Sequence, residues 1–425
     1  MAGIIKKELI NGINLYYIND TKYKTVSMST FVNRRLNKDE ATSNALLSKL
    51  LKRGTVSCKN IRELNAYADK LYGMLYDVNI TKKAYVQSIV SSVNFLSDKY
   101  VENSIIDECS QMMLDMIFKP YITDDAFPEN CFAVEKQNLK DDIEGLINDK
   151  RSYANFRCIE EMCHGEENSI FEFGYLEDLD KITNKELYKH YKSIITESPV
   201  DIFVVGNVDI NKLTEYITDY LTEFNFSIKP ISKKDISIDS SREVKYVEDN
   251  FDVMQGKLAM GFRTDITVDD EKYYALLLGN SIFGSGAHSR LFNTVREKLS
   301  LCYYASSMTD KFRAIMLVSS GIEFENFEKA KTEIEKQLKN ISSGDFTDEE
   351  MEVARSYIIN SYESFKDSPY AMKDYYRGQC FCDNHDTIDE AIEKISKITK
   401  KEVLDALSNV RLDTVYFLKG MEDKK

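Results

Sequence analysis

Two short stretches of the chain, KITNKEL at residues 181–187 and KITKKEV at residues 397–403, are nearly identical although they lie far apart. In each stretch a threonine stands three places before a glutamate, which is the capping-box pattern of a helix start. Each predicted helix leads through a short turn to an apolar strand, at residues 200–206 and 414–420. The sequence therefore predicts a helix–strand unit that occurs twice.

The segments that precede these two units also correspond. In the first half, alternating residues at 12–18 and 25–31 predict strands, and a helix is predicted over residues 38–47. In the second half, a predicted strand at 257–262 is followed by a predicted helix at 270–277. Strands, then helices, then a closing helix and strand predict an α+β domain that is present in two copies.

The chain has 425 residues, which is too long for a single hydrophobic core. A polar, serine-rich stretch at residues 227–241 lies between the two copies and is predicted to be a linker. The expected domains are therefore residues 1–226 and residues 242–425, each with its own core.

The composition argues against several classes of function. A net charge of −14 argues against a nucleic-acid partner, because such a partner favours a basic face. No apolar stretch approaches the roughly 18 residues that cross a membrane, and the N-terminal stretch lacks the pattern of a signal peptide. The eight cysteines are scattered singly or in unlike contexts, and we interpret them as reduced thiols. We expect a cytoplasmic protein with no nucleic-acid and no membrane partner.

Two motifs have alternative interpretations. Cys380, Cys382 and His385 supply two or three metal ligands, but no second cluster completes a tetrahedral site, so structural cysteines are the favoured interpretation. Gly284 and Gly286 precede a predicted helix, a pattern compatible with phosphate binding. The P-loop lysine and the third glycine of a dinucleotide motif are both missing, so we expect a tight, close-packed turn instead.

Residues 283–307 read FGSGAHSRLFNTVREKLSLCYYASS, and this stretch carries a family resemblance. In a duplicated α+β chain it resembles the pitrilysin (insulinase-like) metallopeptidase family, which includes the mitochondrial processing peptidase subunits. The resemblance covers essentially the whole chain. It implies two homologous domains, each a mostly antiparallel sheet flanked by helices, which together form half of a clam-shell peptidase.

The resemblance assigns substrate binding to Arg296 and Tyr303, which match an arginine of the family and a tyrosine seven residues later. In the family these side chains grip the substrate backbone and steady the reacting carbonyl. Their chemistry fits that role, because arginine presents a fixed fork of donors and a tyrosine hydroxyl can donate to an oxyanion. The alternative interpretation is that Arg296 pairs with a nearby acid and Tyr303 packs in a core strand.

Active members of the family bind zinc through a His-x-x-Glu-His motif on a helix of the first domain, followed by a Lys-Gly-Thr-like turn. The turn is matched here at residues 53–55. Counting back from it, Ala45 and Lys49 replace the two histidines, and Ser48 replaces the general base. The third ligand position falls on Asp142, which we expect to pair with Lys49. The resemblance therefore implies no zinc in this chain and no catalysis by it alone.

Catalytic and degenerate subunits commonly pair in this family. We therefore expect the non-catalytic (pseudopeptidase) subunit of a heterodimeric zinc peptidase, similar to the pseudosubunits of Gram-positive bacteria. The expected partners are a zinc-peptidase homologue with an intact motif and a peptide or unfolded polypeptide, and a homodimer is an option when the chain is alone. One alternative is a non-proteolytic scaffold that binds peptides or proteins. Another is an enzyme with a relocated metal or a different reaction.

Overall fold

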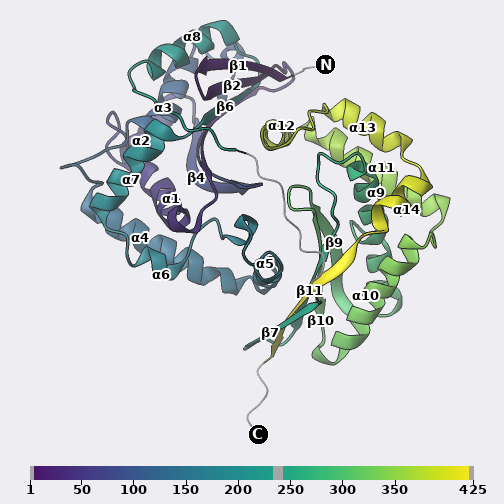
Figure 1. Ribbon diagram of the computed structural model, residues 1–425. Helices are drawn as coiled ribbons and strands as arrows, with labels where there is room; N and C mark the ends of the chain where they lie inside the picture. The colour runs from purple at the N-terminus through teal and green to yellow at the C-terminus, as the bar shows by residue number, and fades with distance from the viewer. Residues whose placement is uncertain (1–3, 233–242, 421–425) are drawn as a thin grey trace. The chain divides into compact units, whose positions relative to one another are not determined.

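The computed structural model describes residues 4–232 and 243–420 (Figure 1). The chain forms two compact units, and neither unit is continuous in sequence. Unit 1 comprises the described residues of Met1–Glu144, Ile170–Lys234 and Asp367–Gly378. Unit 2 comprises the described residues of Gly145–Ser169, Asp235–Lys366 and Gln379–Lys425.

Unit 1 is built on a six-stranded sheet with the order β1-β2-β6-β3-β5-β4. Only the β2–β6 pairing is parallel. The strands are β1 (Ile4–Ile10), β2 (Ile13–Ile18), β3 (Thr25–Arg35), β4 (Leu75–Lys83), β5 (Val86–Leu96) and β6 (Val200–Val205). The helices are α1 (Lys38–Leu51), α2 (Ile61–Lys70), α3 (Ile106–Phe118), α4 (Glu129–Gly145), α6 (Leu176–Leu179), α7 (Asn184–Glu197), α8 (Ile210–Leu221) and α12 (Pro369–Gly378), with the short 3₁₀ turn η1 (Asp98–Tyr100).

Both faces of the unit 1 sheet are covered, as the burial of almost all of β3 shows. Successive side chains of a strand point to opposite faces. Met28 points to the sheet face that α3 covers, where the Ser110 hydroxyl of α3 contacts the Met28 sulfur. Ser29, the next residue, accepts a hydrogen bond from Lys373 of α12. Helix α12, which comes from the second half of the sequence, therefore covers the face opposite to α3.

Unit 2 has a five-stranded sheet with the order β7-β11-β8-β10-β9, in which only the β7–β11 pairing is parallel. The strands are β7 (Lys245–Phe251), β8 (Gly256–Arg263), β9 (Cys302–Asp310), β10 (Ile315–Ile322) and β11 (Arg411–Gly420). The α-helices are α5 (Lys150–Met162), α9 (Tyr273–Phe283), α10 (Phe327–Ser342), α11 (Asp348–Phe365), α13 (Ile388–Lys397) and α14 (Lys400–Leu407). The shorter turns and the π-helix are η2 (Leu146–Asn148), η3 (Glu167–Ser169), η4 (Leu291–Lys298), η5 (Phe324–Asn326) and η6 (Gln379–Phe381).

Helix α5, from the first half of the sequence, packs on β8 and β11 of unit 2. Ala154 and Cys158 of this helix form one buried cluster with Ala259, Tyr416 and Leu418 of the two strands. In unit 1, α12 contacts β3 and β6, which hold the corresponding places in that sheet. Each half of the sequence thus supplies one helix to the sheet of the other half.

The predicted α+β fold with two mostly antiparallel sheets is confirmed. The sheet order β2-β6-β3-β5-β4 of unit 1 matches the order β7-β11-β8-β10-β9 of unit 2, as expected for a duplicated domain. Thr183 caps α7 through the Glu186 N–H, and Thr399 forms a complete capping box with Glu402. The domain limits remain a prediction, since most of the expected linker at 227–241 lies outside the described residues.

None of the described helices is long and apolar enough to cross a membrane. The eight cysteines are all free thiols, and six of them are buried. These six cysteines are therefore core residues.

Helix α12 buries two cations against the sheet of unit 1. The Lys373 ammonium donates to Ser29 Oγ at 2.7 Å, and the Arg377 guanidinium donates to Ser88 Oγ at 2.7 Å and lies 4.1 Å from the ring centre of Phe31. Burial and the neighbouring Arg377 lower the pKa of Lys373 to about 8. A charged Lys373 therefore opposes folding at neutral pH.

We expect Lys373→Met to stabilise the protein at pH 7 by about 1–3 kcal/mol, because it removes a buried charge but keeps the side-chain volume. The folded pKa lies below the value of about 10.4 in the unfolded chain, so the unfolded chain holds more protons and wild-type stability rises with pH across this window. Lys373→Met should flatten that rise in urea unfolding measured from pH 7 to 10. Lys212→Met, a change at an exposed position of α8, is the control. A destabilised Lys373→Met at pH 7 would contradict the prediction.

Candidate functional site

Helix α1 carries three of the residues that the sequence singled out. The helix begins where the Asn37 side chain accepts the Asp39 N–H, and Lys49 lies in its last turn, where a cation complements the helix dipole. Ala45 and Ser48 are buried. The Ser48 hydroxyl donates to the Ala45 carbonyl at 2.8 Å, so it is already satisfied within the helix.

Helix α4 lies beside α1 and presents two carboxylates to it. Lys49 Nζ is 2.5 Å from Asp142, which confirms the predicted ion pair. Arg53, just beyond α1, pairs with Glu135, and the Glu135 side chain is only 7% exposed. Asn138 also donates to Glu135, at 3.1 Å. Cations in and just beyond the last turn of α1 thus pair with these two carboxylates of α4.

The residues at these positions do not fit a zinc ion. Ala45 has no donor atom, Ser48 bonds within its helix, and the Asp142 carboxylate faces an ammonium group. Zinc sites in proteins need three or four histidine, cysteine or carboxylate ligands. Within residues 4–232 and 243–420, no three such side chains are grouped as metal ligands.

A histidine that sequence reasoning did not place lies near α1. His190 of α7 has its Nε2 atom 2.8 Å from Asn44 Oδ1, and the Asn44 amide donates to Gln87. Burial lowers the pKa of His190, although the nearby Glu40 opposes this effect. His190 thus links α7 to α1 by a hydrogen bond. The two residues are far apart in sequence, so no sequence pattern indicates this contact.

The segment with Arg296 and Tyr303 has an irregular backbone. Residues Leu291–Lys298 form a π-helix, a form that is frequent at functional sites. Ser300 follows with a φ of 51°, a conformation that few residues other than glycine adopt. Tyr303 is the extra residue of a β-bulge, because Cys302 and Tyr304 pair with consecutive residues of β10. Such bulges redirect side chains next to binding sites.

The predicted turn before this segment is confirmed. A Cβ at Gly284 would lie 2.4 Å from Ser307 Oγ, so only glycine allows this close approach. Gly286 has a φ of 109°, which also favours glycine. The two glycines therefore serve packing and turn geometry.

Arg296 and Tyr303 line the same open pocket of about 380 Å³. Tyr303 is 56% exposed, so the alternative of a core tyrosine is wrong. Its hydroxyl donates to Glu323, and this hydrogen bond raises the pKa of Tyr303. The Arg296 side chain is 40% exposed, lies 4.6 Å from the ring centre of Phe292, and has a 3.5 Å contact with Glu297. The pocket thus presents both hydrogen-bond donors and acceptors to solvent.

The remaining pocket residues complete this arrangement. Ser300, Leu301, Cys302 and Asn326 also line the pocket. Burial raises the pKa of Cys302, which favours the protonated and unreactive form of this thiol. Glu323 and Asn326 are the members of the pocket that lie outside the stretch 283–307 that the sequence singled out.

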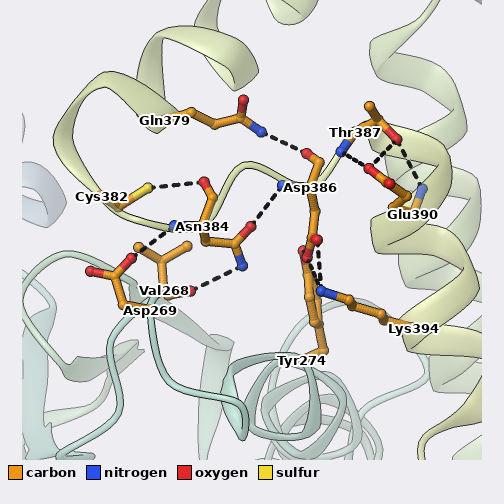
Figure 2. A network of polar contacts seen from close by, with 10 residues as sticks. All are labelled: Val268, Asp269, Tyr274, Gln379, Cys382, Asn384, Asp386, Thr387, Glu390 and Lys394. Atoms are coloured by element: carbon orange, nitrogen blue, oxygen red, sulfur yellow. Dashed lines mark hydrogen bonds and ion pairs between the residues drawn. The ribbon is translucent and has the colours of Figure 1, made fainter. Parts of the chain in front are cut away.

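The loop that contains Cys380, Cys382 and His385 is held by hydrogen bonds (Figure 2). Cys382 Sγ donates to the Asn384 carbonyl at 3.4 Å, and the Asn384 N–H donates to Asp269 at 3.1 Å. The same network continues through Asn384 to the start of α13 (Figure 2). These contacts support the structural interpretation of the loop.

Comparison with known proteins agrees with this fold. The peptidase M16 inactive-domain family matches residues 181–358. The chain is 34% identical over 413 residues to "Probable inactive metalloprotease YmfF" of Bacillus subtilis, covering 97% of this chain and 96% of that protein. It is 21% identical to "Uncharacterized zinc protease YmxG" of the same organism, with 92% of both chains covered. A crystal structure of a conserved protein from Enterococcus faecalis superposes with a TM-score of 0.91, 29% identity, and coverage of 99% of this chain and 100% of that chain.

The two sheets and their helices thus define an M16-like peptidase fold. The chain belongs to the M16 family of peptidases and inactive homologues, and the resemblance inferred from residues 283–307 is confirmed.

Proposed function

We propose that this chain is the non-catalytic subunit of a heterodimeric zinc peptidase and that unit 2 contributes peptide binding. The observation that carries the proposal is the combination of an open pocket lined by Arg296 and Tyr303 with an α1 helix that has no histidine or glutamate at its motif positions 45, 48 and 49. In this proposal Ala45, Ser48, Lys49 and Asp142 are the degenerate positions of the metal site. Arg296 donates to a peptide carbonyl, and Tyr303 donates to the same peptide unit as charge develops.

The relatives support a pairing of this kind. One organism has a relative named as an inactive metalloprotease and another named as a zinc protease. By analogy, the proposed partner of this chain is a homologue with an intact His-x-x-Glu-His motif, and the proposed location is the cytoplasm. When the partner is missing, the chain is proposed to form a homodimer.

The test is affinity purification of the chain from its native host, followed by mass spectrometry. We expect a homologue with the intact zinc motif to co-elute at a stoichiometric ratio. If only peptides or unrelated proteins co-elute, the second candidate, a non-proteolytic binding scaffold, replaces the first.

We expect the purified chain to hold no stoichiometric zinc and to cleave no peptide by itself. The physical reason is the set of side chains at the motif positions, where Ala45 has no donor atom and the Asp142 carboxylate of α4 already faces Lys49. Elemental analysis and a peptide-cleavage assay, with the co-purified partner assayed in parallel, check this expectation. One tightly bound zinc per chain, lost together with proteolysis on chelation, would contradict it.

A further inference from the structure

Glu323 lies at the pocket because of its place in the sheet. It directly follows β10, all of whose residues are buried. Its neighbour Ile322 pairs with Cys302, immediately before the bulged Tyr303. The sheet itself therefore places the Glu323 carboxylate beside the Tyr303 hydroxyl, which donates to it.

The contact with Glu323 limits which other groups can accept a hydrogen bond from the Tyr303 hydroxyl. Across the part of the chain that the structure describes, no lysine or arginine pairs with Glu323, whereas Arg296 in the same pocket contacts Glu297. A tyrosine has one O–H group, so a proton given to Glu323 is not available to a peptide carbonyl. A carboxylate is also a stronger acceptor than a neutral amide carbonyl.

We propose that Glu323 is a positioning residue that reserves the Tyr303 proton for a carbonyl that gains negative charge. A ground-state peptide carbonyl loses the competition with the Glu323 carboxylate, but a developing oxyanion is more basic than a carboxylate and wins it. Binding energy from Tyr303 then appears in the transition state and not in the peptide complex, which is the condition for faster turnover. This inference rests on the proposed function, since it assumes that the pocket binds peptide. The raised pKa of Tyr303 agrees with it.

The first test measures the pKa of Tyr303 in the absence of any ligand, as a probe of its contact with Glu323. The full-length chain is labelled with carbon-13 at tyrosine Cζ, and the Tyr303 signal is assigned by its loss in Tyr303→Phe. We expect Glu323→Gln to lower the pKa of Tyr303 towards that of an ordinary tyrosine. Glu325→Gln, an exposed acid two residues away, is the matched control and should leave the pKa of Tyr303 nearly unchanged. An unaltered pKa of Tyr303 in Glu323→Gln would overturn the proposal.

The second test measures ground-state binding by calorimetry. The probe is a short, uncharged peptide of glycine, serine and alanine, acetylated at its N-terminus and amidated at its C-terminus. We expect Glu323→Gln to bind this peptide about threefold to tenfold more tightly than wild type, the value of one net hydrogen bond. In the Tyr303→Phe background the same change should have no effect. Equal or weaker binding by Glu323→Gln would overturn the proposal.

The binding measurements also distinguish failure of the proposed function from failure of the role of Glu323. If the wild-type chain and Arg296→Ala both fail to bind the peptide, the pocket is not a peptide site and the inference falls with it. If Arg296→Ala weakens binding but Glu323→Gln leaves it unchanged, peptide binding stands and only the role of Glu323 is wrong.

Discussion

Tyr303→Phe, introduced into the complex with the catalytic partner, should lower turnover about a hundredfold and leave assembly and melting temperature near the wild-type values. A hydrogen bond to a developing oxyanion contributes roughly 2.7–4 kcal/mol to the transition state. The side chain is 56% exposed on a bulge of β9, so its hydroxyl contributes little to folding. The measurement is steady-state peptide cleavage and thermal unfolding on the same preparation.

Arg296→Ala is the companion variant. Since Arg296 is proposed to hold the peptide backbone, its loss should raise the half-saturating peptide concentration more than it lowers turnover. Neither change should cost several kcal/mol of stability, because Arg296 is not buried and its contact with Glu297 is 3.5 Å long. Loss of stability with unchanged cleavage per folded complex would make both residues structural.

The second large effect is expected at the buried end of the α1–α4 contact. Arg53→Met leaves the Glu135 carboxylate, 7% exposed, without its cation and should reduce the free energy of unfolding by about 3–5 kcal/mol. Lys49→Met is the matched control: its partner Asp142 is 48% exposed, so the loss should stay within about 1 kcal/mol. Urea unfolding of both variants makes the comparison.

A further variant separates charge from packing. Arg53→Met combined with Glu135→Gln removes both charges and should recover most of the lost stability. If Arg53→Met is neutral, or if Lys49→Met is equally damaging, the two ion pairs do not differ in burial as the structure indicates.

Several features of this protein were predictable because they depend on contacts between close neighbours in sequence. The capping threonines Thr183 and Thr399 bond to residues three places away, so the pattern alone located two helix starts. Alternation identified the strands, because side chains of a strand face opposite sides in turn. The Lys49–Asp142 pair was also expected, although here the family resemblance supplied the register between two helices.

Other features were decided only by tertiary structure. An amphipathic pattern shows that a helix buries one face but not against which sheet, so the exchange of α5 and α12 between the units had no sequence signal. Likewise, the bulge that exposes Tyr303 arises from pairing with β10, and Glu323 reaches the pocket only because β10 ends there. Sequence by itself determined the local elements and the residue types, since these follow from short-range hydrogen bonds and periodicity. Which side chains meet was decided by the tertiary structure, because contacts between distant residues depend on how whole sheets and helices pack.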